Sequence, residues 1–296
     1  MYQRAKYKDT STDWTKITNP VATKKIDGAH YFLIVGPTGQ LSYISRRPSI
    51  KGGYPDRSAN LPHLTSKVFP HLAGEIYSVE LHHTGHSKLN MESHPAVSGI
   101  LNSLPARAIE TQKTTGPIRA ALIDVIKPEL KTYADKVDHL KKFESQFGNS
   151  DILFVPPIKI GKDEINDLIE STKAEGSEGV IITSYTKPEA ENYRVKIKHI
   201  NTYNLKITGI TREIDIQGNP KDSAGAVIVS DATGREVGNV GTGFTREQRI
   251  DIYKNPGRWK NKLIQVKALP PTAYRLRSPV FNGDADGDID EVIPVK

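Results

Sequence analysis

The chain has no cysteine among its 296 residues. It can therefore form no disulfide framework and no thiolate zinc finger, and it offers no cysteine nucleophile. It also has no hydrophobic run long enough to cross a bilayer, and its polar first residues do not resemble a signal peptide. These absences predict a cytoplasmic protein with no membrane partner.

Acidic residues are in deficit. Lysine and arginine total 41 against 34 aspartate and glutamate residues, which gives a net charge of +7. An excess of this sign attracts phosphates and is typical of proteins that handle nucleic acid, although it is not specific to them. The length is sufficient for two domains with separate cores.

The segment from Thr23 to Gly28 reads Thr-Lys-Lys-Ile-Asp-Gly. We expect a strand over residues 22–26, a tight Asp27-Gly28 turn and a returning strand over residues 31–35, which together form a hairpin. Lys25 precedes the bend and could act as a nucleophile if its pKa is lowered, and the charge of neighbouring Lys24 could lower it. The alternative is a solvated lysine before an ordinary turn.

Five further short motifs follow along the chain. They are Ser45-Arg46, Gly74-Glu75-Ile76-Tyr77, Leu122-Ile123-Asp124-Val125, Glu178-Gly179-Val180-Ile181-Ile182 and Lys196-Ile197-Lys198. Taken singly, each also fits an ordinary strand end or the wet face of a strand. Taken in this order, they resemble the motifs of the covalent nucleotidyltransferases: ATP-dependent DNA ligases, RNA ligases and the enzymes that cap messenger RNA.

The resemblance implies a role for the lysines. Lys25, with Asp27 in the same motif, would take AMP from ATP and hold it through a phosphoramidate bond. Lys196 and Lys198 are alternate residues on one strand face, and they would stabilise the α-phosphate.

The resemblance also implies the remaining contacts to the nucleotide. Glu75 would bind the ribose, and Thr23 the adenine edge. The expected metal is Mg²⁺, with Mn²⁺ as the alternative, and its expected ligands are Glu178 and Glu75. The full set of expected nucleotide-binding residues is Thr23, Lys24, Lys25, Glu75, Ile123, Lys196 and Lys198.

The fold class predicted is α+β, with two domains. Residues 1–200 mix strands with helical periodicity, seen at Leu130, Tyr133, Val137 and Leu140 and again before Gly176. We expect a nucleotidyltransferase (adenylation) domain of antiparallel sheets with flanking helices there. A polar linker over residues 199–204 leads into residues 201–296, where short β runs surround one helix with a Thr245/Gln248 capping box; this pattern suggests an OB-fold barrel.

Two segments in the second half favour one branch of the family. Residues 237–245 resemble the glycine-rich turn of the DNA ligase OB domain, and residues 276–281 resemble a later segment of that domain. The resemblance spans about residues 20–283 and implies a minimal ATP-dependent DNA ligase of phage or viral type, acting as a monomer on nicked duplex DNA. It would then work in the host cytoplasm, and its expected DNA-binding residues are His30, Arg46 and Arg277.

Some positions depart from the family pattern. His30 replaces an arginine, Ile123 replaces an aromatic residue that stacks on adenine, and Ala73 replaces an aspartate. An acidic run over residues 282–291 takes the place of a basic last motif, and we expect it to be a solvated tail. The alternatives that stay open are an RNA ligase, a capping-type guanylyltransferase and a noncatalytic nick-binding relative.

Overall fold

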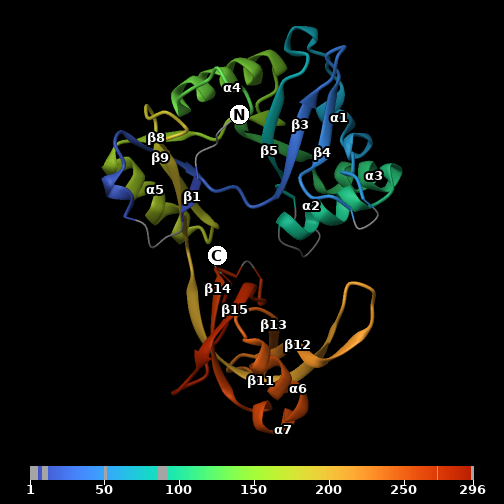
Figure 1. Cartoon of the computed structure of the whole chain (residues 1–296), viewed down its shortest axis with the longest axis vertical. Helices are drawn as coiled ribbons and strands as arrows, with labels where there is room; N and C mark the ends of the chain where they lie inside the picture. The colour runs from blue at the N-terminus through green and yellow to red at the C-terminus, as the bar shows by residue number, and fades with distance from the viewer. Residues whose placement is uncertain (1–5, 9–12, 50–51, 86–92, 272, 295–296) are drawn as a thin grey trace. The chain divides into compact units, whose positions relative to one another are not determined.

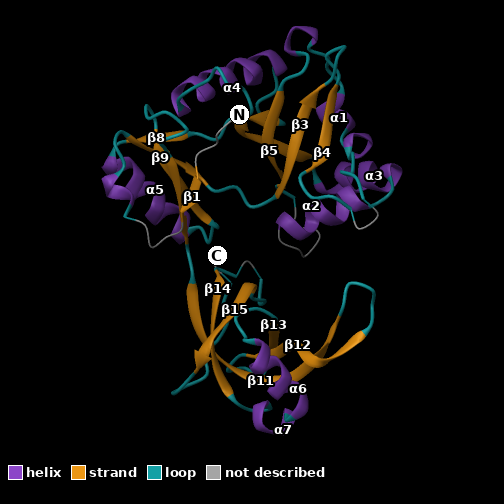
Figure 2. Ribbon diagram, in the orientation of Figure 1, coloured by secondary structure: helices purple, strands orange, loops and turns teal. Residues whose placement is uncertain are grey.

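The computed structural model describes residues 6–8, 13–49, 52–85, 93–271 and 273–294 (Figure 1). Within these ranges the chain is a mixed α+β protein with three five-stranded sheets and seven α-helices (Figure 2). It divides into two compact units. Unit 1 comprises Met1–Thr172 and Gly179–Ile197, and unit 2 comprises Lys173–Glu178 and Lys198–Lys296.

The first sheet of unit 1 has the strand order β1-β10-β9-β2-β8. In chain order its strands are β1 (Lys6–Lys8), β2 (Pro20–Lys24), β8 (Ile158–Ile160), β9 (Gly179–Ser184) and β10 (Tyr193–Lys198). Helix α5 (Lys162–Ala174) buries Ile165 against Ala22, Val180 and Val195 of this sheet. The helical periodicity predicted before Gly176 is confirmed by α5.

The second sheet of unit 1 has the order β4-β3-β5-β6-β7. Its strands are β3 (Ala29–Val35), β4 (Leu41–Ser45), β5 (Ile76–His83), β6 (Ile118–Val125) and β7 (Leu153–Phe154). Its core includes buried side chains of α2 (Ser93–Asn102) and α3 (Pro105–Thr115). Shorter helices complete unit 1: η1 (Trp14–Lys16), η2 (Ser58–Asn60), α1 (Pro62–Thr65) and η3 (Pro70–Leu72).

Helix α4 (Tyr133–Phe147) packs against both sheets. Leu140 and Phe143 belong to the core of the second sheet, whereas Tyr133 and Val137 pack with Val21 of the first sheet. A capping box between Thr132 and Asp135 fixes its start, and Gly148 in the left-handed conformation ends it. The helix that the sequence predicts here is confirmed.

The predicted hairpin at Asp27-Gly28 is wrong. Strand β2 pairs with β8 and β9, and β3 pairs with β4 and β5, so residues 25–28 carry the chain from one sheet to the other. Gly28 is required for another reason: a Cβ there would lie 2.1 Å from the carbonyl oxygen of Leu81. The glycine therefore permits a close backbone approach to β5.

Unit 2 contains the third sheet, of order β13-β12-β11-β14-β15. Its strands are β11 (Asn201–Ile214), β12 (Pro220–Ser230), β13 (Glu236–Val240), β14 (Leu263–Leu269) and β15 (Arg277–Asp284). The two edges are joined, because Thr242 after β13 forms a parallel bridge to Val280 of β15. Helices α6 (Arg246–Lys254) and α7 (Pro256–Trp259) lie between β13 and β14 in the chain, and Ile252 and Trp259 enter the core.

Several local predictions for unit 2 are confirmed, and two are corrected. The sequence predicts strands over residues 205–210, 224–229, 236–240 and 263–268, and these lie within β11, β12, β13 and β14. The Thr245/Gln248 capping box is also present. The predicted linker is too long, since β11 already begins at Asn201. The acidic run is solvated as predicted, because its carboxylate residues are exposed, but it is not a free tail. It begins in β15, the Asp290 carboxylate accepts a 2.6 Å hydrogen bond from the Asn204 backbone amide, and Val292 just after the run is fully buried in the core.

In the part of the chain that the structure describes, none of the helices is long and apolar enough to span a membrane.

Candidate active site

Unit 1 contains a cavity of about 760 Å³ that both of its sheets line. Thr23, Lys24 and Lys25 come from the end of the first sheet's strand β2 and the residue after it. Ile123 comes from β6 of the second sheet, and Lys196 from β10 of the first. The cavity thus gathers motifs that are far apart in the sequence.

Lys25 is held by its backbone at the edge of the first sheet. Strand pairing places Lys24 opposite Val180, and one residue further the Lys25 amide donates a 2.8 Å hydrogen bond to the Gly179 carbonyl. The Lys25 side chain is partly exposed and lines the cavity. Its backbone position is therefore fixed while its long side chain can reach a ligand.

The charges around the cavity have one dominant sign. Its basic lining residues are Lys24, Lys25, Arg46, Arg47, Arg57, Arg194 and Lys196. Among the described residues that line it, Glu80 alone is acidic. A cavity with this balance attracts polyanions such as nucleoside triphosphates and nucleic acid phosphates.

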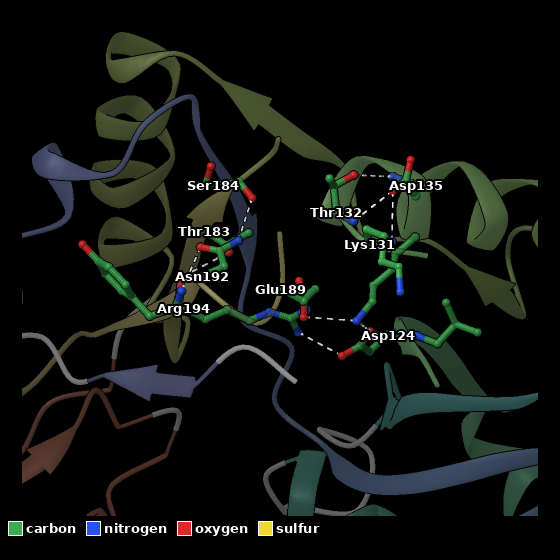
Figure 3. A network of polar contacts seen from close by, with 12 residues as sticks. Asp124, Lys131, Thr132, Asp135, Thr183, Ser184, Glu189, Asn192 and Arg194 are labelled. Carbon is green, nitrogen blue, oxygen red and sulfur yellow. Dashed lines mark hydrogen bonds and ion pairs between the residues drawn. The ribbon is translucent and has the colours of Figure 1, made fainter. Parts of the chain in front are cut away.

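A network of four buried charges lies beside the cavity (Figure 3). Lys136 Nζ lies 2.9 Å from Asp124 Oδ1 and 3.1 Å from Glu189 Oε2. The Arg194 guanidinium contacts the same two carboxylates at 3.3 Å. Each charge thus has opposite partners, which buried charges require.

This network joins the two sheets. Asp124 belongs to β6 of the second sheet and Arg194 to β10 of the first, and Lys136 of α4 contacts Asp124 between them. Burial lowers the pKa of Arg194, but the nearby Asp124, Tyr7, Glu189 and Tyr133 together outweigh burial, and the pKa lies well above the ordinary value. Arg194 therefore stays charged where it lines the cavity.

The structure brings most of the predicted site residues to this cavity. Those that line it are Thr23, Lys24, Lys25, His30, Arg46, Ile123 and Lys196. His30 Nε2 lies 2.6 Å from Ser78 Oγ, and His30 is the strand partner of Glu80. Asp27 lies in the connection between Lys25 and Gly28, outside the regular strands.

Glu178 and Lys198 form a pair of their own. Their nearest oxygen and nitrogen atoms are 3.8 Å apart, with the Glu178 side chain 12% exposed and that of Lys198 42% exposed. Glu178 directly precedes Gly179, whose carbonyl accepts the hydrogen bond from Lys25. Both residues belong to unit 2, whereas the residues that line the cavity belong to unit 1.

Glu75 is not among the residues that line the cavity. It precedes β5, where its carboxylate accepts hydrogen bonds from Tyr77 and pairs with Lys127 and, at 2.7 Å, with His139. Burial raises its pKa, but these hydrogen bonds, that of Lys127 first, outweigh burial and lower it. Along one strand, Glu75 lies about 16 Å from Glu80, which lines the cavity instead.

Arg277, expected to contact DNA, lies in unit 2 at the start of β15. It is 5% exposed, and its guanidinium donates to the backbone carbonyl of Pro270 at 3.3 Å. A side chain buried in this way offers little surface to DNA.

Several lining residues were not predicted from the sequence, among them Tyr7, Arg47, Arg57, Glu80 and Arg194. Arg194 had a signal, because it lies two residues before Lys196 and shares its strand face. Glu80 had a signal too, because it lies five residues after the glutamate of an assigned motif, Glu75. Tyr7 had none, because its three-residue strand β1 is defined only by parallel pairing with β10.

No protein-family model matches the sequence, and no curated protein matches it either. Solved structures do match. The structure described as "Pmar-Lig_PreS3" is 15% identical, with a TM-score of 0.67 over 96% of this chain and 67% of that one. A structure from "DNA binding with a minimal scaffold: Structure-function analysis of Lig E DNA ligases" is 14% identical, with a TM-score of 0.61 over 96% of this chain and 98% of that one.

This chain therefore has the fold of a minimal DNA ligase, as its motifs predict. At these identities the likeness establishes the fold alone.

Proposed function

We propose that this chain is an ATP-dependent DNA ligase that seals nicks between a 5′-phosphate and a 3′-hydroxyl in duplex DNA. The observation that carries the proposal is the position of Lys25 on the wall of a cavity lined by seven basic side chains. A lysine can attack phosphorus where neighbouring positive charge favours its neutral form and neutralises the phosphates. The fold that this chain shares with a minimal DNA ligase also supports the proposed ligase activity.

In the proposed first step, the neutral Lys25 amine attacks the α-phosphorus of ATP. A nitrogen–phosphorus bond forms, the bond from the α-phosphorus to the bridging oxygen breaks, and pyrophosphate leaves with that oxygen. The proton that the nitrogen loses passes to solvent. Lys196 neutralises the α-phosphate, and Thr23 and Ile123 contact the adenine.

Glu80, rather than the Glu75 predicted from the sequence, binds the ribose hydroxyls of ATP. It lines the cavity, whereas the Glu75 carboxylate is already engaged by Tyr77, Lys127 and His139. A carboxylate accepts hydrogen bonds from both ribose hydroxyls, which suits the one acidic side chain among the described lining residues.

Glu178 fits magnesium better than Glu75 does. Magnesium binds through one or two carboxylates, substrate phosphates and waters, and it needs no cage of protein ligands. When bound, Mg²⁺, or Mn²⁺ in its place, would neutralise phosphate charge, with Glu178 as the protein ligand and Lys198 beside it.

Two further steps complete the proposed reaction. A 5′-phosphate oxygen at the nick attacks the lysyl-AMP phosphorus, which releases Lys25 and forms the DNA-adenylate. The 3′-hydroxyl then attacks the 5′-phosphorus, and AMP leaves. Arg46 and His30, at the cavity, are the proposed contacts to nick phosphates.

We further propose that residues 1–200 form the nucleotidyltransferase domain and that residues 201–296 form an OB-fold domain. The joined edges of the third sheet and the helix between its third and fourth strands support the OB assignment. Such a barrel would bind the DNA backbone, and a single monomer would contain every residue that the reaction requires.

A sealing assay tests the proposal. Nicked duplexes carrying DNA or RNA on either side of the nick are incubated with the protein, magnesium and either ATP or GTP. Sealing of the all-DNA nick with ATP is the expected result. Sealing of RNA alone would indicate an RNA ligase, and use of GTP a guanylyltransferase. Nick binding without sealing would indicate a noncatalytic relative.

A further inference from the structure

The short strand β1 places an aromatic ring in the cavity. Its parallel register pairs Tyr7 with Arg194 and Lys8 with Val195 of β10. Paired residues face the same side of a sheet, and residues two apart along a strand do so too. Tyr7, Arg194 and Lys196 therefore share one face, and all three line the cavity.

The ring of Tyr7 contacts the lysine proposed for the α-phosphate. Lys196 Nζ lies 3.9 Å from the ring centroid of Tyr7, and the Arg194 guanidinium carbon lies 5.9 Å from it. Tyr7 is 38% exposed, so water reaches the contact only in part. An ammonium at this distance from an aromatic face is attracted to the ring.

This contact restricts a side chain that is otherwise long and mobile. A lysine has four rotatable bonds, and its ammonium is useful for phosphoryl transfer only when it is oriented before the reaction. Arg194 cannot serve in its place, because the buried Asp124 and Glu189 hold its guanidinium. Tyr7 is the cavity residue whose ring lies against Lys196.

We propose that Tyr7 is a positioning residue, which orients the Lys196 ammonium toward the α-phosphate during transfer of AMP to Lys25. The proposal rests on the proposed function and extends it to the segment before the Lys-x-Asp-Gly motif. Tyr7 acts through Lys196 and takes no part in bond making. Its ring is what matters, and its hydroxyl is dispensable.

Two readouts on the full chain test this role. The first is a proton–carbon NMR spectrum of lysine side chains without nucleotide, in which the Lys196 ε-methylene should be shifted upfield by the Tyr7 ring. The second is the rate of AMP uptake at increasing ATP. Tyr7→Leu should abolish the upfield shift and lower the limiting rate roughly tenfold with little change in KM, and Tyr7→Phe should retain both.

The chain provides a matched control on the same strand. Lys8 Nζ lies 3.9 Å from the Tyr193 ring on the opposite face, away from the cavity. Lys8→Ala removes a contact of the same kind from β1 and should leave both readouts unchanged. Tyr7→Leu should also add nothing to the loss in a Lys196→Ala background, because the two residues act as one unit.

Three outcomes overturn the positioning role. The first is a Lys196 NMR signal that Tyr7→Leu does not move. The second is a rise in KM at constant limiting rate in Tyr7→Leu, which would mean that Tyr7 contacts the nucleotide itself. The third is an effect of Lys8→Ala on both readouts equal to that of Tyr7→Leu. A wild-type protein that takes up no AMP contradicts the proposed function instead. Wild-type uptake that is insensitive to Tyr7 contradicts only the present inference.

Discussion

The backbone amide of Lys25 donates a 2.8 Å hydrogen bond to the carbonyl oxygen of Gly179. This bond continues the pairing of β2 with β9 by one residue, and it places the Lys-x-Asp-Gly motif beside the Glu-Gly motif. After it, the chain leaves the first sheet and enters the second at Ala29. Lys25 therefore lies where the two sheets of unit 1 approach each other at the cavity.

The proposal that Glu80 binds the ribose in place of Glu75 gives the first prediction. Glu80→Gln should raise the KM for ATP in lysine adenylylation roughly ten- to hundredfold, because a charged acceptor for the ribose hydroxyls is lost. Glu75→Gln, at the residue just before the same strand, should change the KM less than about twofold. The two variants are compared by the rate of AMP incorporation at increasing ATP. A larger rise in the KM for ATP in Glu75→Gln than in Glu80→Gln would favour Glu75 as the ribose contact, as predicted from the sequence.

Gly28 gives the second prediction. Gly28→Ala brings a Cβ against the Leu81 carbonyl and forces the backbone beside Lys25 to move. It should lower the free energy of unfolding by about 1–3 kcal/mol and reduce AMP uptake. Urea unfolding measures the first effect, with Gly99→Ala as the control.

Gly99 is helical and has open space around the position of a Cβ. Its replacement by alanine should stabilise the protein by about 0.5–1 kcal/mol. Equal effects of the two substitutions would contradict the close approach of Gly28 to β5.

The buried charge network gives the third prediction. Lys136→Met removes one of the two cations that contact both Asp124 and Glu189. Of the network's cations, Arg194 then remains to balance two buried carboxylates. The free energy of unfolding should fall by about 3–5 kcal/mol. Lys113→Met breaks an exposed pair with Glu110 on α3 and should change it by less than about 1 kcal/mol. Similar losses in the two variants would mean that the network is not desolvated.

The pH dependence of stability gives the fourth prediction. The pKa of Glu75 is lowered in the folded protein from an ordinary value of 4.5, so its ionised form stabilises the fold above that pH. The stabilisation should be lost as the pH falls below 4.5 through the folded pKa. Urea unfolding of the wild type and Glu75→Gln should therefore differ most near neutral pH and converge in acid. A difference that does not vary with pH would contradict the contacts to Lys127 and His139.

Local patterns predicted the elements of this fold well. The apolar spacing of Tyr133, Val137 and Leu140 and the capping residue Thr245 are local signals, and both predicted helices are present. Partners of strands are a different matter. Residues 22–35 contain two strands and a turn signal, yet the partners of β2 are β8 and β9, more than a hundred residues away. A turn signal cannot show which of several β runs will pair.

The site residues divide in the same way into those with a local sequence signal and those set by strand pairing. Lys25, Ile123 and Lys196 were predicted because the order of the motifs can be read from the sequence, and all three line the cavity. Glu75 and Glu80 belong to the same stretch of sequence, and only the register of β5 opposite β3 places Glu80 beside His30. Tyr7 depends on a three-residue pairing with β10, for which neither periodicity nor a turn provides a signal.

The central claim is that Lys25 becomes covalently linked to AMP. The intact mass of the purified protein after incubation with ATP and magnesium tests it most directly, with Lys25→Ala and GTP as parallel samples. The account predicts a gain of one AMP that requires both ATP and Lys25. A folded wild-type protein that starts without AMP and gains no mass, or a Lys25→Ala variant that gains it equally, would contradict the account.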